Sequence, residues 1–114
     1  MKGDQMQTSD FIEKIVSPRF KECVMLMATV KDKEYNRYND KFHNFYRAAC
    51  IAQVTPETAL LGMWMKHIVS ILDMIDDIEK EHFVLNEEVL SEKMNDNHNY
   101  LFLLEGIIRE RFKD

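Results

Sequence analysis

Residues that break helices are scarce in this chain. Its 114 residues include only 3 glycines and 2 prolines, Pro18 and Pro56. So few breakers favour long helices with few turns, and they disfavour a fold of many short strands. The hydrophobic content of 46% is enough for a packed core. We therefore predict an all-α bundle of four main helices, with a flexible N-terminus over residues 1–8 and a single helical domain over residues 9–114.

Local start signals divide the chain into helical segments. A first helix is expected to begin near Ser9, and Ser17-Pro18 reads as a second start. The first region is therefore either one kinked helix or a short extra helix followed by a longer one over about 18–33. A polar loop over 31–40, with Asn39 or Asp40 as a cap, precedes a helix over about 41–53.

The second half of the chain carries the clearest start signals. Thr55-Pro56 predicts a third helix that runs to about Lys80, and Asn86 caps a last helix that runs nearly to the C-terminus. Apolar residues at helical spacing give each helix a predicted core face. These faces are Phe20, Val24 or Cys23, Met27 and Val30; Phe42, Phe45, Ala49 and Ala52; Leu61, Trp64, Ile68, Ile71, Ile75 and Ile78; and Leu90, Met94, Leu101, Leu104 and Ile108.

Charge and cysteine usage narrow the function classes. The net charge of −5 argues against binding to nucleic acid or to an anionic membrane, because both need an excess of Lys and Arg. Charged residues such as Lys66 and Asp73 interrupt the longest apolar stretches, which argues against a membrane span. Cys23 and Cys50 lie among apolar neighbours and are predicted to be buried free thiols. The predicted location is the cytoplasm.

Polar residues occur on helix faces that are apolar elsewhere along the same helix. In the third helix, one face runs through Ala59 and Met63 and then becomes polar; in the last helix, a polar face continues into Leu103 and Ile107. If the two helices pair antiparallel across their short connection, their polar halves meet at one end of the bundle. The predicted pocket holds Asp40, Asn44, Lys66, His67, Asp73, Asp77, Glu92, Asp96 and Asn99.

Such a pocket has the chemistry of a magnesium–nucleotide site. Carboxylates that project inward from several helices are how bundles hold divalent metals, and Mg²⁺ commonly bridges to phosphates. The candidate metal ligands are Asp73, Asp77, Glu92 and Asp96. Lys66 is the candidate phosphate contact, Asn44 and Asn99 are positioning groups, and Tyr35 or Tyr38 is the candidate for stacking on the base.

A non-enzymatic alternative stays open beside the nucleotide hypothesis. The same carboxylates fit a solvated helix face with weak surface ion pairs. The chain would then be a helical interaction module, and Met63, Trp64 and Met65 would form its contact surface. A homodimer is expected under either hypothesis, because a domain of this length has a thin margin of stability. The sequence leaves open whether the chain is an enzyme.

Four short segments resemble a family of small phage and prophage proteins that includes nucleotide-modification-associated domains and domains of unknown function. The segments are Lys31-Asp32-Lys33-Glu34-Tyr35, Asp40-Lys41-Phe42-His43-Asn44-Phe45, Lys66-His67-Ile68-Val69-Ser70-Ile71, and the stretch from Glu92 to Leu101. The resemblance covers roughly residues 20–108. It implies a phage-type helical protein close to nucleotide metabolism, located in the host cytoplasm.

A wider similarity is to the all-α nucleotide pyrophosphatases of the MazG and dimeric dUTPase type. This similarity implies an oligomeric helical protein that uses Mg²⁺. Those enzymes carry Glu-Glu-x-x-Glu on one helix and Glu-x-x-Asp on another. This chain departs from the pattern, because it has no Glu-Glu-x-x-Glu and its Glu92 and Asp96 are four residues apart rather than three. The departure puts pyrophosphatase activity in doubt.

Overall fold

The structure, a computed structural model, describes residues 5–29, 37 and 40–113 and confirms the predicted all-α fold. The helical elements are α1 (Thr8–Phe11), the π-helical segment η1 (Ile12–Val16), α2 (Ser17–Ala28), α4 (His43–Ala52), α5 (Pro56–Glu79) and α6 (Glu87–Arg111). Because α1, η1 and α2 follow one another without a break, they form the first of four main helices.

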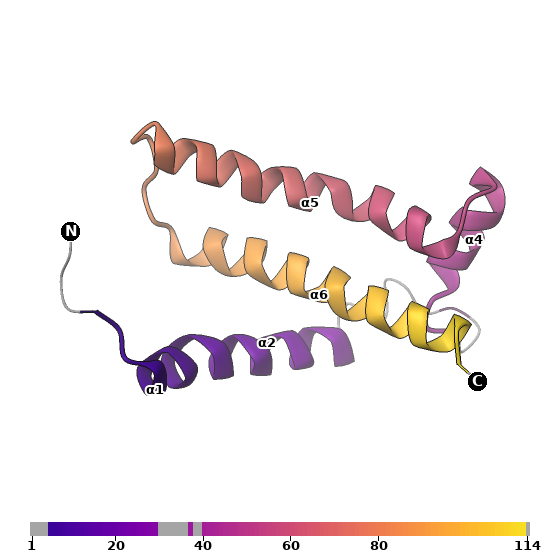
Figure 1. The fold of residues 1–114 in the computed structure, drawn as a ribbon, viewed down its shortest axis with the longest axis horizontal. Coiled ribbons are helices and arrows are strands. Elements are labelled where there is room, and N and C mark those ends of the chain that lie inside the picture. Colours follow the sequence, from indigo (N-terminus) through magenta and orange to yellow (C-terminus); the bar gives the residue numbers. More distant parts are fainter. Residues whose placement is uncertain (1–4, 30–36, 38–39, 114) are drawn as a thin grey trace.

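The long helix α6 lies between two others. Figure 1 shows α5 and α6 as an antiparallel pair joined by a short turn, with α2 along the opposite side of α6. The helix α4 packs against α5, whereas no Cα atom of α2 lies within 8 Å of a Cα atom of α5. The predicted antiparallel pairing of the third and last helices is therefore confirmed, but the helices do not close into a ring around one core.

Side-chain caps fix the starts of the two longest helices as predicted. The Thr55 hydroxyl accepts a hydrogen bond from the Thr58 backbone N–H at 3.2 Å, and Asn86 Oδ1 accepts one from the Val89 N–H at 3.0 Å. These bonds satisfy backbone donors that have no partner inside a helix. The chain needs no tertiary contact to define these two starts.

The N-terminal helix differs from the prediction at both of its start signals. It begins at Thr8 without a side-chain cap, so Ser9 is not the cap. Ser17 lies inside the continuous helix and caps nothing. Instead, the helix widens to π geometry just before Pro18, where the Ser17 N–H bonds to the Ile12 carbonyl. A proline has no N–H and its ring clashes with the carbonyl four residues earlier, and a wider turn relieves this conflict.

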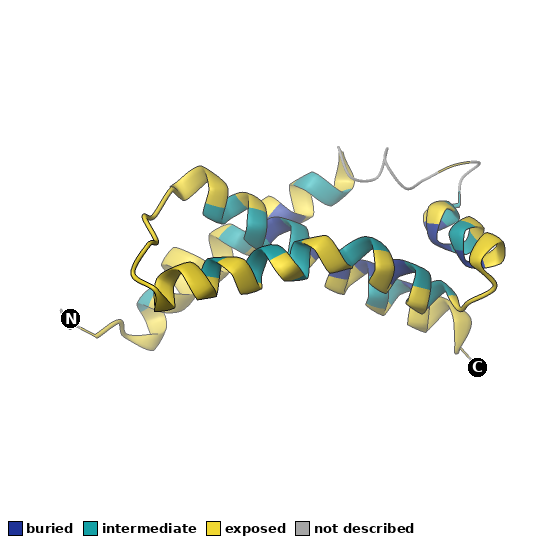
Figure 2. Cartoon of the chain, turned by 90° about the horizontal axis from the view of Figure 1, so that it is seen from above, coloured by how far each residue is buried: buried dark blue, intermediate teal, exposed yellow. Residues whose placement is uncertain are grey.

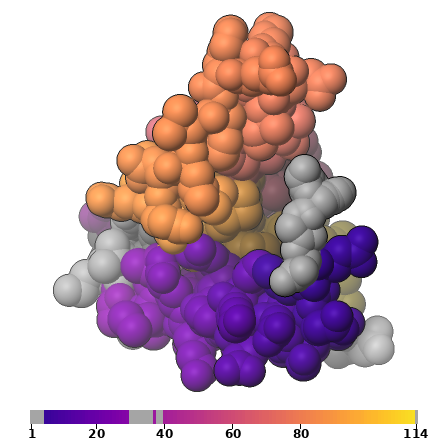
Figure 3. Space-filling model, turned by 90° about the vertical axis from the view of Figure 1, so that its left-hand side faces the viewer, coloured from indigo at the N-terminus to yellow at the C-terminus, as the bar shows by residue number. Residues whose placement is uncertain are grey.

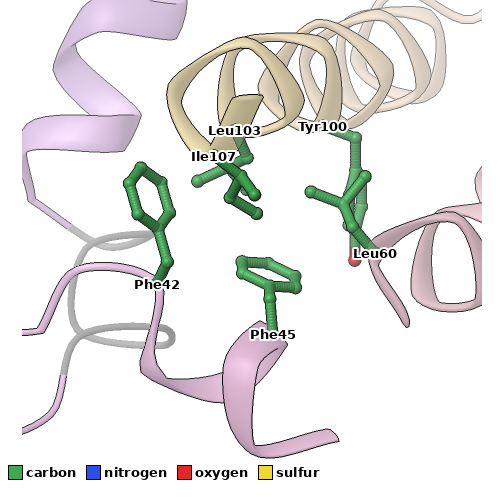
Figure 4. Packing of buried hydrophobic residues seen from close by; sticks show 6 residues of the cluster. All are labelled: Phe42, Phe45, Leu60, Tyr100, Leu103 and Ile107. Atoms are coloured by element: carbon green, nitrogen blue, oxygen red, sulfur yellow. The ribbon is translucent and has the colours of Figure 1, made fainter. Parts of the chain in front are cut away.

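A small core joins α4, α5 and α6 near one end of the α5–α6 pair. It consists of Phe42, Phe45, Leu60, Tyr100, Leu103 and Ile107 (Figure 4). Gly106 is part of this packing, because a Cβ added there would lie 2.7 Å from the Phe42 ring. The ring therefore packs directly on the α6 backbone, which only glycine permits.

An ion pair and a hydrogen bond hold the same end together. Glu57 near the start of α5 forms an ion pair with Arg111 at the end of α6. Burial alone would raise the pKa of Glu57, but the hydrogen bond and charge of Arg111 outweigh it and hold the pKa below its usual value. The Tyr46 hydroxyl of α4 donates a hydrogen bond to Glu110 at 2.7 Å, and burial together with this bond raises the pKa of Tyr46 to about 12.

Several predicted core positions are exposed. In α5 the predicted face divides: Trp64, Ile68 and Ile71 are half-buried against the bundle, whereas Leu61, Ile75 and Ile78 are exposed. The other exposed positions are Phe20 and Val24 in α2, Ala52 in α4, and Leu101 and Ile108 in α6. These predictions are wrong because each helix has more apolar surface than its neighbours cover, so periodicity could not tell the covered face from the open one.

The molecule is open and elongated. Its accessible surface is 8728 Å², against roughly 6,600 Å² for a compact monomer of 13.6 kDa. Its radius of gyration is 17.0 Å, against roughly 13 Å for a compact domain of this length. Exposed residues cover much of every helix in Figure 2, and in Figure 3 the α5–α6 turn projects well beyond the layer that contains α2.

Two neighbouring isoleucines in α6 test where the core lies. The Ile107 side chain is 0% exposed, whereas Ile108 is 41% exposed. We expect Ile107→Ala to lower the free energy of unfolding by about 2–5 kcal/mol, because it leaves a cavity, and Ile108→Ala to lower it by less than about 1 kcal/mol. Urea denaturation followed by circular dichroism measures both. Equal losses for the two variants would contradict the described orientation of α6.

Candidate functional site

A polar cleft lies between the middle of α5 and the first half of α6. Its volume is about 320 Å³. The lining residues are Lys66, His67 and Ser70 of α5, and Val89, Glu92, Lys93, Asp96 and Asn97 of α6. The antiparallel pairing of the two helices creates this cleft by placing a polar face of each opposite the other.

The cleft contains only part of the predicted pocket. Lys66, Glu92 and Asp96 line it together, as expected from the two polar faces. Asp73 and Asp77 are exposed on α5 and are not among the lining residues.

The predicted positioning and stacking residues lie elsewhere. Asn44 is exposed on α4, whereas Asn99 is buried in α6 and its Oδ1 has no hydrogen-bond partner among the residues that the structure describes. Neither residue lines the cleft. The predicted stacking residues Tyr35 and Tyr38 lie outside the described residues. Of the predicted pocket, the structure therefore gathers Lys66, His67, Glu92 and Asp96.

A network of interhelical contacts occupies the floor of the cleft. His67 Nδ1 lies 3.4 Å from Asp96 Oδ2, and Lys93 Nζ donates to the Ser70 hydroxyl. Asn97 donates to the backbone carbonyl of His67 at 3.2 Å and accepts from the Trp64 indole N–H at 2.8 Å. Each contact joins α5 to α6, so the network fixes how the two helices are aligned along their length.

Aromatic rings continue this network toward the core. Trp64 and Tyr100 are stacked with ring centroids 6.1 Å apart, and the His67 ring lies 5.4 Å from Tyr100.

Asn97 is a residue of this network that the sequence prediction did not assign to the site. The sequence did contain a signal for Asn97, the polar run Asn95-Asp96-Asn97-His98-Asn99. Asparagine and aspartate are unfavourable inside a helix, so a group of them there indicates that their side chains bond to other parts of the fold.

The charges and backbone around the cleft limit its chemistry. The two lysines and two carboxylates that line it balance one another, so an anion finds no net positive charge there. Its walls are the interiors of two α-helices, where backbone N–H groups already bond to carbonyls, so none is available for an oxyanion. Among the described residues, no three His, Cys, Asp or Glu side chains form a group suited to a metal ion. A magnesium site made by Asp73, Asp77, Glu92 and Asp96 stays a prediction.

A second polar cluster joins α2 to the other side of α6. The buried Asn95 accepts a hydrogen bond from Arg19 at 2.9 Å and donates to Glu22. The Cys23 thiol donates to the same Asn95 Oδ1 at 3.5 Å, and burial raises the pKa of this thiol. The prediction that Cys23 is buried is confirmed, whereas the same prediction for Cys50 is wrong, because Cys50 lies on an outer face of α4.

The outer face of α5 carries an exposed apolar stripe. We call Leu61, Met65, Ile68, Leu72 and Ile75 the α5 stripe. Its members recur at intervals of four, three, four and three residues, which is the spacing of a helix that packs along another helix. All are exposed except Ile68, which is half-buried. The stripe lies along one side of α5, next to the inner face that Leu60, Trp64 and His67 occupy, and Ile68 is half-buried where the two faces meet.

The apolar character of α5 also bears on a membrane location. By length and composition α5 could cross a membrane, with a mean hydropathy of 1.3 over 18 residues, of which 6% are buried. An apolar helix of a water-soluble protein meets the same criterion. The absence of a membrane span therefore stays a prediction.

Comparisons with models of protein families, with curated protein sequences and with solved structures found no match. The resemblance to phage proteins and the similarity to all-α pyrophosphatases therefore stay predictions.

Asn97 provides a direct test of the interhelical network. Asn97→Ala removes the acceptor of the Trp64 N–H and leaves it half-buried, so we expect the free energy of unfolding to fall by about 1–3 kcal/mol. Because Trp64 is the only tryptophan, its fluorescence emission should shift in the folded variant. Substitution of the adjacent exposed His98 by Ala is the control and should change neither quantity. An unaltered spectrum in Asn97→Ala would contradict the described contact.

Proposed function

We propose that this chain is a homodimeric interaction module, and that the α5 stripe is the surface through which two copies associate. The observation that carries the proposal is the stripe itself: five apolar side chains in heptad spacing, four of them exposed, along one side of a 24-residue helix. An exposed apolar surface of this extent is characteristic of an interaction site in water. The regular spacing favours another helix as the occupant.

The surface area of the chain supports a second copy as that occupant. The accessible surface of 8728 Å² exceeds the compact-monomer value by roughly 2,100 Å². A stable protein–protein interface buries about 800 Å² on each partner. Covering the α5 stripe with a second copy would use part of this excess, and it would cover a side of α5 that neither α4 nor α6 covers.

The charges on α5 weigh against a lipid bilayer as the occupant. Lys66 and Asp73 lie within the most central part of the helix, and each costs about 2.5–3.5 kcal/mol at the centre of a membrane span. The net charge of −5 also disfavours adsorption to an anionic membrane surface. A second protein surface on the stripe covers the apolar side chains and leaves Lys66 and Asp73 uncovered, because both lie on another side of α5.

Leu72 offers the sharpest test of the proposal. Its side chain is 57% exposed and lies within the stripe, so Leu72→Glu should place a charge inside the interface and convert the dimer to a monomer. Val84, which is 84% exposed in the α5–α6 turn, provides the matched control, because Val84→Glu adds the same charge outside the stripe. Sedimentation equilibrium over a range of concentrations gives the association state, and the Tm of the parent chain should rise with concentration.

Two outcomes would overturn the proposal. One is a parent chain that stays monomeric at all concentrations, with a Tm that does not depend on concentration. The other is flotation of the parent chain with vesicles of zwitterionic lipid, abolished by Leu72→Glu, which would identify a bilayer as the occupant of the stripe.

The polar cleft supports a second candidate function, the binding of a nucleotide with Mg²⁺. The supporting observation is that α5 and α6 bring Lys66 together with Glu92 and Asp96. In this proposal the two carboxylates hold Mg²⁺, which carries the positive charge that the cleft itself lacks, and Lys66 contacts a phosphate.

A thermal-shift screen tests the second candidate. Nucleoside mono-, di- and triphosphates are added with and without Mg²⁺, and a true ligand should raise Tm by several degrees only when the metal is present. Glu92→Gln should abolish the shift. The exposed Glu88 lies one helical turn earlier outside this cleft, so Glu88→Gln should retain it. A flat response across the panel would leave the dimer as the only proposed function.

A further inference from the structure

We infer that the surface through which two copies associate is two helices wide. It consists of the α5 stripe and of a parallel row of side chains on α6, so the core of the dimer is a bundle of four helices, α5 and α6 from each copy. This inference rests on the proposed dimer and adds a second helix to its interface. It follows from the side of the α5–α6 pair on which the two rows lie.

A row of side chains on α6 repeats the spacing of the α5 stripe. Its members recur at intervals of four, three, four and three residues, so they share one side of the helix. We call the following residues the α6 row: Leu90, Met94, Asn97, Leu101 and Leu104. Leu101 is 50% exposed, and the other members are half-buried. Because all members but Asn97 are apolar, α6 presents a second apolar row in addition to the stripe.

A contact between the two helices places the stripe and the row on the same side of the pair. Trp64 follows Leu61 by three residues and precedes Ile68 by four, so it borders the stripe. Its indole N–H donates a hydrogen bond to Asn97, a member of the row, at 2.8 Å. The side of α5 that carries the stripe therefore adjoins the side of α6 that carries the row.

The interhelical contacts also align the two rows along their length. Trp64 is level with Asn97, and two turns further along α5 the Ser70 hydroxyl accepts a hydrogen bond from Lys93. Because α5 and α6 are antiparallel (Figure 1), each step forward along the stripe corresponds to a step backward along the row. The level pairs are Leu61 with Leu101, Met65 with Asn97, Ile68 with Met94, and Leu72 with Leu90.

The opposite side of the α5–α6 pair is polar. Lys66 and Ser70 lie roughly half a turn around α5 from the stripe, and Glu92 lies roughly half a turn around α6 from the row. All three line the polar cleft. The two helices together therefore form one amphipathic layer, whose polar side suits water and whose apolar side suits a second apolar surface.

A hollow beside the α6 row indicates that a neighbouring element is missing there. Its volume is about 630 Å³, and Leu101 and Leu104 are among the residues that line it. All the described lining residues belong to α6, so within the described part of the chain no second helix fills the hollow. Side chains of a second copy that lies against the row would occupy this space.

The second row gives the interface a width that the stripe alone lacks. From Leu61 to Ile75 the stripe is about 21 Å long at 1.5 Å per residue, and a helix is about 10 Å wide, so one row covers roughly 200 Å² in flat projection. A stable interface buries about 800 Å² on each partner. The α6 row doubles the projected area, and the buried accessible surface is larger still because it follows the contours of the side chains.

Leu101 provides the direct test, because it belongs to the row and not to α5. Leu101→Glu should raise the dissociation constant of the dimer at least about tenfold, because an unpaired charge resists burial between the copies. Its far-UV circular dichroism should match that of the parent, since the side chain is half exposed in the single chain. Val89→Glu is the matched control. Val89 is 48% exposed on α6 but lines the polar cleft, so this variant should keep the parent affinity in sedimentation equilibrium.

A milder substitution tests the same position without adding a charge. In a Cys50→Ser background, which removes the exposed thiol, Leu101→Cys is labelled with N-ethylmaleimide at protein concentrations below and above the dissociation constant. We expect the labelling rate to fall at least about tenfold at the higher concentration, because the second copy covers the thiol. Val89→Cys in the same background should be labelled at the same rate at both concentrations.

The outcomes separate this inference from the proposed function. Parent affinity in Leu101→Glu, together with dissociation of Leu72→Glu, would show that α5 alone forms the contact and would overturn the four-helix core while leaving the dimer standing. A labelling rate of Leu101→Cys that does not depend on concentration, in a chain that sediments as a dimer, would do the same. Equal dissociation of Val89→Glu and Leu101→Glu would also overturn the role of the row. A monomeric parent chain would overturn the dimer and the four-helix core together.

Discussion

The arrangement of this protein depends on two asparagines that project from opposite sides of α6. Asn95 bonds to Arg19 and Glu22 of α2, and Asn97 bonds to Trp64 and to the backbone of His67 in α5. A buried amide that loses its partners costs about 1–3 kcal/mol, so each neighbouring helix has one low-energy alignment against α6. Apolar contacts between helices tolerate sliding far better than these bonds do.

The separation of the polar interhelical bonds from the apolar core explains why the fold is open. The apolar core gathers at the end of the α5–α6 pair where α4 packs, and polar contacts hold the remainder of both long helices. Because α6 lies between α2 and α5, each outer helix has one covered face and one uncovered face. The α5 stripe is thus a consequence of the topology, and association of two copies would complete for α5 the packing that the single chain leaves unfinished.

The sequence predicted the parts of the fold that local chemistry determines. Thr55 and Asn86 cap their helices through their own side chains, and the short connection after α5 determines that α6 returns antiparallel. The sequence could not predict which apolar face of a helix its neighbours cover. In α5, for example, Leu61 and Trp64 are equally compatible with a core face until the neighbours of the helix are known. The candidate site was limited in a different way. Lys66, Glu92 and Asp96 meet because the pairing was predicted correctly, whereas Asp73 and Asp77 share a side of α5 with Lys66 but lie farther toward the C-terminal end of the helix, beyond the cleft.

The contact of Phe42 with Gly106 has a consequence for how this sequence can change over generations. An alanine at position 106 would favour the helix locally, yet it collides with the aromatic ring as long as residue 42 is phenylalanine. The two positions are therefore epistatic: the order in which substitutions arrive decides whether each is tolerated. A smaller side chain has to appear at position 42 before position 106 is released, so relatives that carry a residue larger than glycine at position 106 should also carry a smaller side chain at position 42.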